Sequence, residues 1–99
     1  MGYAIEYSST VHTRTGISSS ATALSANDNR RTVLIQNLGT NPLFVKFGTG
    51  ATTSDFDIIL KGGTANDDGL GGVLSFDTLS YTGVITIAGT SPRYTATDF

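Results

Sequence analysis

Cysteine and tryptophan are absent from the 99-residue sequence, and charged residues make up only 14% of it. The lack of cysteine excludes a disulfide scaffold, a catalytic thiol and a thiolate metal site. The net charge is −2 and the sequence pI is about 4.9. The six basic residues are scattered, except for the pair Arg30–Arg31. Nucleic-acid-binding proteins typically carry a basic stripe and a high pI, so we expect no nucleic-acid partner.

Long apolar runs are also absent. No stretch approaches the ~20 residues that a membrane-spanning helix needs. Residues 1–6 contain neither the basic nor the apolar region of a secretory signal, so we expect no membrane partner and no secretory signal. The length fits one domain, residues 1–99. Residues 1–16 are interpreted as an N-terminal arm or docking strand of that domain.

Threonine and serine are unusually frequent, with 16 and 10 residues respectively. Threonine suits the pleated surface of a sheet, whereas good helix formers are scarce: one Glu, one Gln, one Met and two Lys. We therefore expect an exterior covered with hydroxyl groups rather than charges. This is common in all-β proteins that assemble into larger bodies, and it is equally typical of a small threonine-rich sandwich.

Short strand-like runs recur between glycine-bearing turns, at about the 8–12-residue spacing of a sandwich or barrel. No segment has a sustained helical period. The expected strands comprise residues 4–7, 10–15, 17–24, 32–37, 42–47, 55–61, 73–76, 84–88 and 93–99. The sequence thus predicts an all-β fold, a small antiparallel β-sandwich or Greek-key barrel of about seven or eight strands.

The clearest expected element is a hairpin of residues 32–37 and 42–47. The first run is apolar on both faces, which is typical of a central strand buried on both sides. The second alternates, with Leu43, Val45 and Phe47 on one face.

The alternating runs together predict one hydrophobic core. In residues 55–61 the apolar side chains should point inward, so that Asp55 and Asp57 share the outer face of one strand. The core is predicted to contain Val33, Ile35, Leu43, Val45, Phe47, Phe56, Ile58, Leu60, Val84 and Ile87.

Residues 29–48 run N-R-R-T-V-L-I-Q-N-L-G-T-N-P-L-F-V-K-F-G. This segment resembles a pattern of small tailed-bacteriophage virion proteins, in which a polar N-R-R loop enters an L-I-Q-N strand and an N-P turn precedes an aromatic, β-branched strand and a glycine. Residues 58–63 and 81–90 are similar to the downstream part of that pattern, and the resemblance covers residues 17–99. The acidic, glycine-rich turn at residues 66–72 departs from the family's shorter connection, which leaves the register there open.

The resemblance implies a virion structural protein. Such proteins are capsid decoration (cement) proteins, bases of head fibres or small tail-associated modules. The first of these implies that the protein is made in the bacterial host cytoplasm and lies on the capsid surface of the virion. The implied partner is the major capsid protein, and the implied oligomer is a homotrimer, since the resembled proteins often stand at three-fold positions of a shell.

Catalytic residues are not indicated. His12 is the only histidine, and although hydroxyl residues surround it, a Ser-His-acid triad is defined by geometry and not by composition. The glycines of residues 48–50 and 69–72 lack the spacing and the following helix of a phosphate-binding loop. We expect a surface or interface histidine, turn glycines, no enzymatic activity and no small-molecule substrate.

Two acidic pairs are candidate cation ligands: Asp55 with Asp57, and Asp67 with Asp68 beside Asn66. Ca²⁺ needs six to eight oxygen ligands, and no D-x-D-x-D-G loop is present. We therefore expect solvated turn carboxylates, no metal and no cofactor.

Two groups of residues are candidates for a partner interface. Arg30 and Arg31 could pair with acidic groups of a partner, or one stem could pack while the other head is solvated. Tyr3, Ile5 and Tyr7 would line one face of a strand that docks on another subunit or on its own sheet.

A carbohydrate-binding module is the alternative from a different class, with the tyrosines as a sugar platform that the lack of tryptophan weakens. An exposed aromatic row on one sheet face would favour this module. A terminal arm that leaves the domain would favour a decoration protein or a fibre base.

Overall fold

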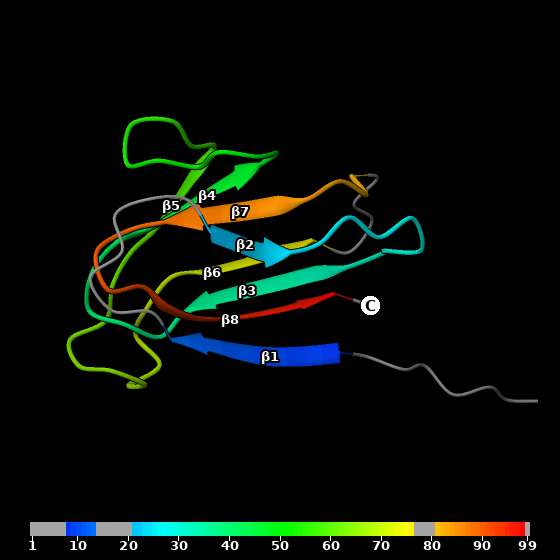
Figure 1. The fold of residues 1–99 in the computed structure, drawn as a ribbon. Coiled ribbons are helices and arrows are strands. Elements are labelled where there is room, and N and C mark those ends of the chain that lie inside the picture. Colours follow the sequence, from blue (N-terminus) through cyan, green and yellow to red (C-terminus); the bar gives the residue numbers. More distant parts are fainter. Residues whose placement is uncertain (1–7, 14–20, 77–80, 99) are drawn as a thin grey trace, which may run out of the picture.

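A computed structural model gives the fold and describes residues 8–13, 21–76 and 81–98, with the backbone alone for residues 8–13. The described residues form eight strands and no helix (Figure 1). They consequently include no helix long and apolar enough to cross a membrane. The strands are β1 (Ser8–Thr13), β2 (Ala21–Leu24), β3 (Val33–Asn37), β4 (Leu43–Phe47), β5 (Ile58–Leu60), β6 (Val73–Phe76), β7 (Ile85–Ala88) and β8 (Arg93–Asp98).

The strands form two four-stranded sheets, in the orders β1-β8-β3-β6 and β2-β7-β4-β5. We call them sheet A and sheet B, and they lie as two layers in Figure 1. Every strand pair is antiparallel, and the pairs β1–β8, β2–β7, β3–β6 and β4–β5 are nested. This order is that of an eight-stranded jelly roll, a double-sheet sandwich built from Greek keys. The predicted fold class, an all-β antiparallel sandwich, is confirmed.

The predicted hairpin of residues 32–37 and 42–47 is wrong. Strand β3 lies in sheet A and β4 in sheet B, so residues 38–42 cross between the layers. Strand β3 is also not buried on both sides, because Leu34 on its outer face is 40% exposed. Its antiparallel neighbours are β6 and β8, which come from much later in the chain.

The predicted strand of residues 55–61 is shorter in the structure, since β5 begins only at Ile58. Asp55 forms an isolated bridge with Thr52, and the Asp57 carboxylate accepts a hydrogen bond from the Phe47 amide. The two carboxylates therefore precede the strand and do not share one of its faces. Within β5 the alternation holds, with Ile59 exposed and Leu60 buried.

The remaining predicted strands agree closely with the structure. Residues 73–76 form β6, while β7 and β8 cover most of residues 84–88 and 93–99. Strand β1 begins at Ser8, two residues before the predicted strand of residues 10–15. Strand β2, at the edge of sheet B, corresponds to the last four residues of the predicted strand 17–24. The predicted strand at residues 4–7 lies outside the described residues.

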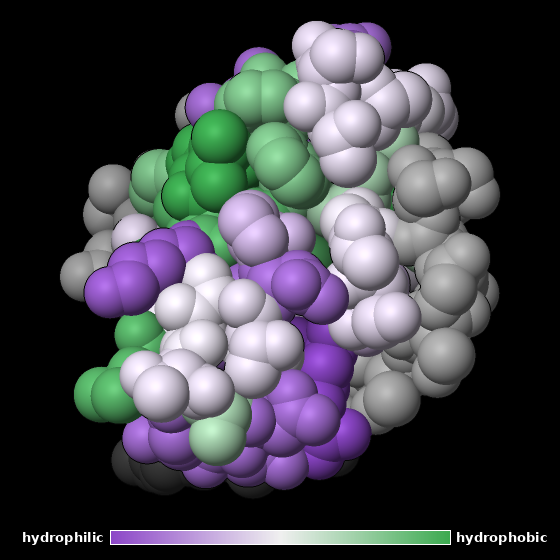
Figure 2. All heavy atoms as spheres, turned by 90° about the vertical axis from the view of Figure 1, so that its left-hand side faces the viewer, coloured by the Kyte–Doolittle hydropathy of each residue, from purple (hydrophilic) through white to green (hydrophobic). Residues whose placement is uncertain are grey.

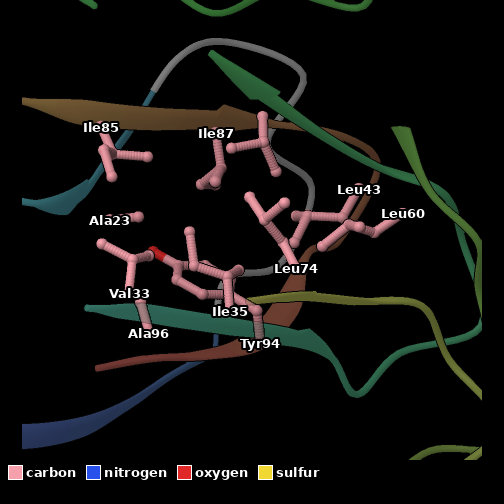
Figure 3. Packing of buried hydrophobic residues seen from close by; sticks show 11 residues of the cluster. Ala23, Val33, Ile35, Leu43, Leu60, Leu74, Ile85, Ile87, Tyr94 and Ala96 are labelled. Carbon is pink, nitrogen blue, oxygen red and sulfur yellow. The ribbon is translucent and has the colours of Figure 1, made fainter. Parts of the chain in front are cut away.

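The core lies between the two sheets (Figure 3). Six of the ten predicted core residues are buried there: Val33, Ile35, Leu43, Val45, Leu60 and Ile87. Phe47 and Ile58 are partly buried and pack against the cluster. The cluster also contains residues that the prediction omitted: Ala23, Leu74, Ile85, Tyr94 and Ala96.

Two of the predicted core positions are wrong. Ile85 is buried in the cluster, whereas its neighbour Val84 is only half-buried and lies before β7 begins. Phe56 is half-buried and contacts the ring of Phe44, with the ring centroids 4.9 Å apart. The alternating pattern that predicts an inward position for both residues continues in the sequence beyond the true ends of the strands.

The loop that follows β4 covers the outer face of sheet B at β7. The loop after β4 places the Ala51 amide on the hydroxyl of Thr86, at 3.1 Å. The same hydroxyl donates to the Gly48 carbonyl at 2.7 Å. This cover accounts for the burial of Thr86, whereas Ile85 and Ile87 are buried on the inner face, in the core.

Candidate functional site

The loops at one end of the sandwich are bonded to one another. They are the β3–β4 loop (38–42), the β5–β6 loop (61–72) and the β7–β8 loop (89–92), and we call them the tied-loop end. Figure 2 looks onto this end, with hydrophilic residues gathered over its lower part, where the β5–β6 loop lies in Figure 1. Loops held by a scaffold are a common place for binding residues.

Asn37, the last residue of β3, is the centre of this end. Its side chain is buried, and its amide nitrogen donates to the carbonyls of Asn41, Leu60 and Lys61 at 2.8, 3.0 and 3.2 Å. Its side-chain oxygen accepts from the Gly39 amide at 2.9 Å. One side chain thus connects the β3–β4 loop to the end of β5, which compensates for its burial.

Backbone hydrogen bonds add further connections between the loops. The Gly63 amide donates to the Gly39 carbonyl and the Asp67 amide donates to the Leu38 carbonyl, both at 2.8 Å. The Leu38 amide donates to the Arg93 carbonyl, also at 2.8 Å. The β5–β6 loop is therefore attached to the β3–β4 loop at two points, and the β3–β4 loop is attached to β8.

Asp67 and Arg93 form a two-point ion pair across this end. The Arg93 Nε donates to Asp67 Oδ1 at 2.8 Å, and Nη2 donates to Oδ2 at 2.6 Å. The hydrogen bond from Arg93 lowers the pKa of Asp67 below its ordinary value of 3.8. Both side chains are partly exposed, so the pair positions the loop more than it stabilises the domain.

Asp68 closes the turn of the β5–β6 loop. Its Oδ2 accepts from the amides of Thr64 and Ala65, each at 2.8 Å, and its Oδ1 accepts from the Leu70 amide at 2.9 Å. These bonds, the one from Leu70 foremost, lower the pKa of Asp68. The carboxylate that could have held a cation is used for local structure.

Glycine is required where this loop approaches its neighbours. A Cβ atom on Gly71 would lie 2.0 Å from the Asn37 carbonyl oxygen, and one on Gly62 would lie 2.2 Å from that of Thr40. Both contacts are to backbone, which cannot move aside cheaply. The glycine-rich sequence thus permits close packing here.

The predicted interface residue Arg30 lies at the opposite end of the sandwich, and its side chain is 0% exposed. It donates to Asp98 at 3.1 Å and to the carbonyls of Ser25 and Gly83, each at 2.7 Å. Arg31 is exposed, which corresponds to the expected packed stem beside a solvated head. The Arg30 guanidinium is thus engaged inside the domain, and only Arg31 of the pair is accessible to a partner.

The other predicted site residues fall in different places. Tyr3, Ile5 and Tyr7 lie outside the described residues. His12 belongs to β1, where its backbone is paired with that of Tyr94.

Acidic side chains do not gather into a metal site. Asp55 forms an ion pair with Lys46 at 2.6 Å, away from the Asp67–Arg93 pair. In the part of the chain that the structure describes, no three His, Cys, Asp or Glu residues form a group that could hold a metal ion.

Exposed apolar side chains are aliphatic. Among the described residues the large exposed ones are Leu34, Ile59, Leu70 and Val73. Tyr81 is half-buried and Tyr94 is buried. The described surface therefore lacks the exposed aromatic row expected of a carbohydrate-binding module.

Sequence reasoning missed the central role of Asn37. Its position two residues before Gly39, at the start of a Leu-Gly-Thr-Asn-Pro turn, was a usable signal, because asparagine side chains commonly bond to turn backbone. The acceptors on β5 carried no comparable signal.

No protein-family model matches the sequence, and no curated protein or solved structure matches it.

Proposed function

We propose that the protein is a bacteriophage virion structural protein that decorates the outer surface of the capsid by binding the major capsid protein. The observation that carries the proposal is the resemblance of residues 29–48 to small virion proteins. The jelly-roll sandwich with tied loops supports it, because such loops lose little conformational freedom on binding. Jelly rolls also occur in viral capsid and lectin domains, so the fold is compatible with the proposal without identifying it.

The mechanism is non-covalent. Each copy bridges neighbouring capsid subunits and adds contact area to the shell. A shell carries many identical sites, so a copy bound at one site meets neighbouring sites at a high effective concentration. Modest single contacts can therefore give a durable coat.

The first test is whether the gene lies beside a major capsid gene, and the second is co-sedimentation of the purified protein with shells assembled from that capsid protein. We expect saturable binding and a higher temperature of shell disassembly. Mass spectrometry of purified particles provides an independent measurement. Detection of the protein only at the tail or head fibres would instead support the tail-associated or fibre-base assignment.

We further propose that the protein is a homotrimer. Closed cyclic symmetry is common among soluble oligomers, and a low net charge of −2 provides little repulsion between copies. Light scattering at tens of micromolar should give three times the monomer mass of 10.3 kDa. A monomer at that concentration contradicts the trimer but not the capsid role.

A further inference from the structure

Asp68 and Gly69 form the one Asp-Gly step of the sequence. In such a step the main-chain nitrogen of the glycine can attack Cγ of the aspartate, because glycine has no Cβ atom to restrict the backbone. The nitrogen–carbon bond forms, and the hydroxyl of the carboxyl group and the amide proton leave as water, which gives a five-membered succinimide. Water then opens this ring at either carbonyl. The product is aspartate again or isoaspartate, whose main chain runs through the former side chain.

The Asp-Gly step lies on the surface, in the turn of the β5–β6 loop, where residues 64–70 are all exposed. Gly69 has a φ of +77°, in the region that glycine adopts readily. Apart from its chain neighbours, no heavy atom of the described residues lies within 4 Å of the position that a Cβ of Gly69 would take. Space for the ring, and for the water that opens it, is therefore available.

The folded loop holds the Asp68 carboxylate in a form that reacts slowly. Its Oδ2 accepts from the amides of Thr64 and Ala65, and its Oδ1 accepts from the Leu70 amide. The carboxylate can turn its Cγ toward the Gly69 nitrogen only if some of these bonds break. The same bonds favour the ionised carboxylate, which is a poorer electrophile than the neutral acid. Ring formation is therefore slow while the loop is closed.

Opening of the loop depends on the contacts that attach it to the rest of the tied-loop end. The amides of Asp67 and Gly63 donate to the carbonyls of Leu38 and Gly39, and the Asp67 carboxylate pairs with Arg93. A reaction that requires an open segment proceeds in proportion to the population of the open form. Two of these attachments belong to Asp67, the residue directly before the reacting step, so they control how often that step is released.

We propose that Asp68–Gly69 is a site of spontaneous isoaspartate formation, and that the attachments of the tied-loop end set its rate. Isoaspartate adds one carbon to the main chain and moves the carboxylate, so the amides that now share this acceptor lose it. The segment that follows also shifts, including Gly72, whose amide donates to the Lys61 carbonyl and whose carbonyl accepts from the Asn37 amide. The modification therefore loosens the tied-loop end, whether or not the proposed function is correct.

The experiment incubates the whole protein at neutral pH in water enriched in heavy oxygen. Each ring opening adds one oxygen from water to Asp68, and peptide mapping with electron-transfer fragmentation locates this oxygen and distinguishes isoaspartate from aspartate. We expect both signals at Asp68 and neither at Asp67, which is the internal control in the same loop. The rate should be at least about tenfold lower in the folded protein than in the protein unfolded by urea.

Arg93→Ala and Lys46→Ala form a matched pair of variants, because each removes the cation of a partly exposed ion pair. Arg93→Ala should raise the rate at Asp68 about twofold to fivefold, the range that an exposed ion pair supports, and Lys46→Ala should leave it unchanged. Urea denaturation confirms that both variants are folded. Equal rates in folded and unfolded protein, or in folded Arg93→Ala and the parent, would overturn the control by the loop. Heavy oxygen that accumulates only at other aspartates would overturn the site.

Discussion

The side-chain amide of Asn37 donates a 3.0 Å hydrogen bond to the carbonyl of Leu60, which lies 23 residues later and in the opposite sheet. With the bonds to Asn41 and Lys61 it joins the two layers at one end of the sandwich. A buried polar side chain that crosses between layers fixes their relative register as well as the loops above them.

Replacement of Asn37 by alanine should lower the free energy of unfolding by at least about 2 kcal/mol, because the buried Leu60 carbonyl and the partly buried carbonyls of Asn41 and Lys61 lose a donor. Urea denaturation measures this. The control is Asn41→Ala, because Asn41 is exposed and its carbonyl remains after the substitution; that variant should stay within about 0.5 kcal/mol of the parent. Equal stability of the two variants would contradict the role of Asn37.

Arg30 and Arg31 form a matched pair for a second test. Arg30→Ala should cost about 3 kcal/mol or more, since it leaves Asp98 and two carbonyls without their buried donor. Arg31→Ala, at an exposed position, should change the free energy of unfolding by less than about 0.5 kcal/mol. Thermal or urea denaturation of both variants distinguishes the buried arginine from the exposed one, and similar costs would argue against this assignment.

Ile35 and Leu34 test which face of β3 is the core face. Ile35 is 0% exposed, so Ile35→Ala should cost about 2–5 kcal/mol through lost transfer energy and the remaining cavity. Leu34→Ala, on the outer face, should cost much less. A value for Ile35→Ala within about 0.5 kcal/mol of the parent would reject the core assignment.

Acid should loosen the tied-loop end. The pKa values of Asp67 and Asp68 are lowered by hydrogen bonds that exist only in the folded state. Their stabilisation is therefore complete well above the ordinary pKa of 3.8 and is lost as the pH falls from that value through the lowered folded-state values.

Amide exchange of the Leu70 region is the measurement for this acid effect, because both carboxylates are exposed and global stability should respond weakly. After correction for the intrinsic pH dependence, protection should decrease below about pH 4. The same measurement on Asp68→Asn should show reduced protection already at neutral pH. Unchanged protection in that variant would mean that the carboxylate does not hold the loop.

Several features of the fold were predictable from single segments. The abundance of threonine and the regular turns gave the all-β class, and alternation placed Leu43, Val45 and Leu60 inward. These predictions depend on local backbone preference and on a period of two, which neighbouring residues suffice to establish.

Other features depended on residues distant in the sequence. Alternation reports which face of a strand is buried but not which strand lies beside it, so β3 and β4 looked like a hairpin although they belong to different sheets. The burial of Arg30 depends on Asp98, and that of Thr86 depends on the loop at Gly48 and Ala51.

The sequence by itself thus determined the strand content and the inward residues of most strands. The tertiary structure alone decided the jelly-roll pairing and the role of Asn37. The physical reason is that pairing energy between strands depends on partners brought together by the whole chain, whereas the pattern within one strand records only its own two faces.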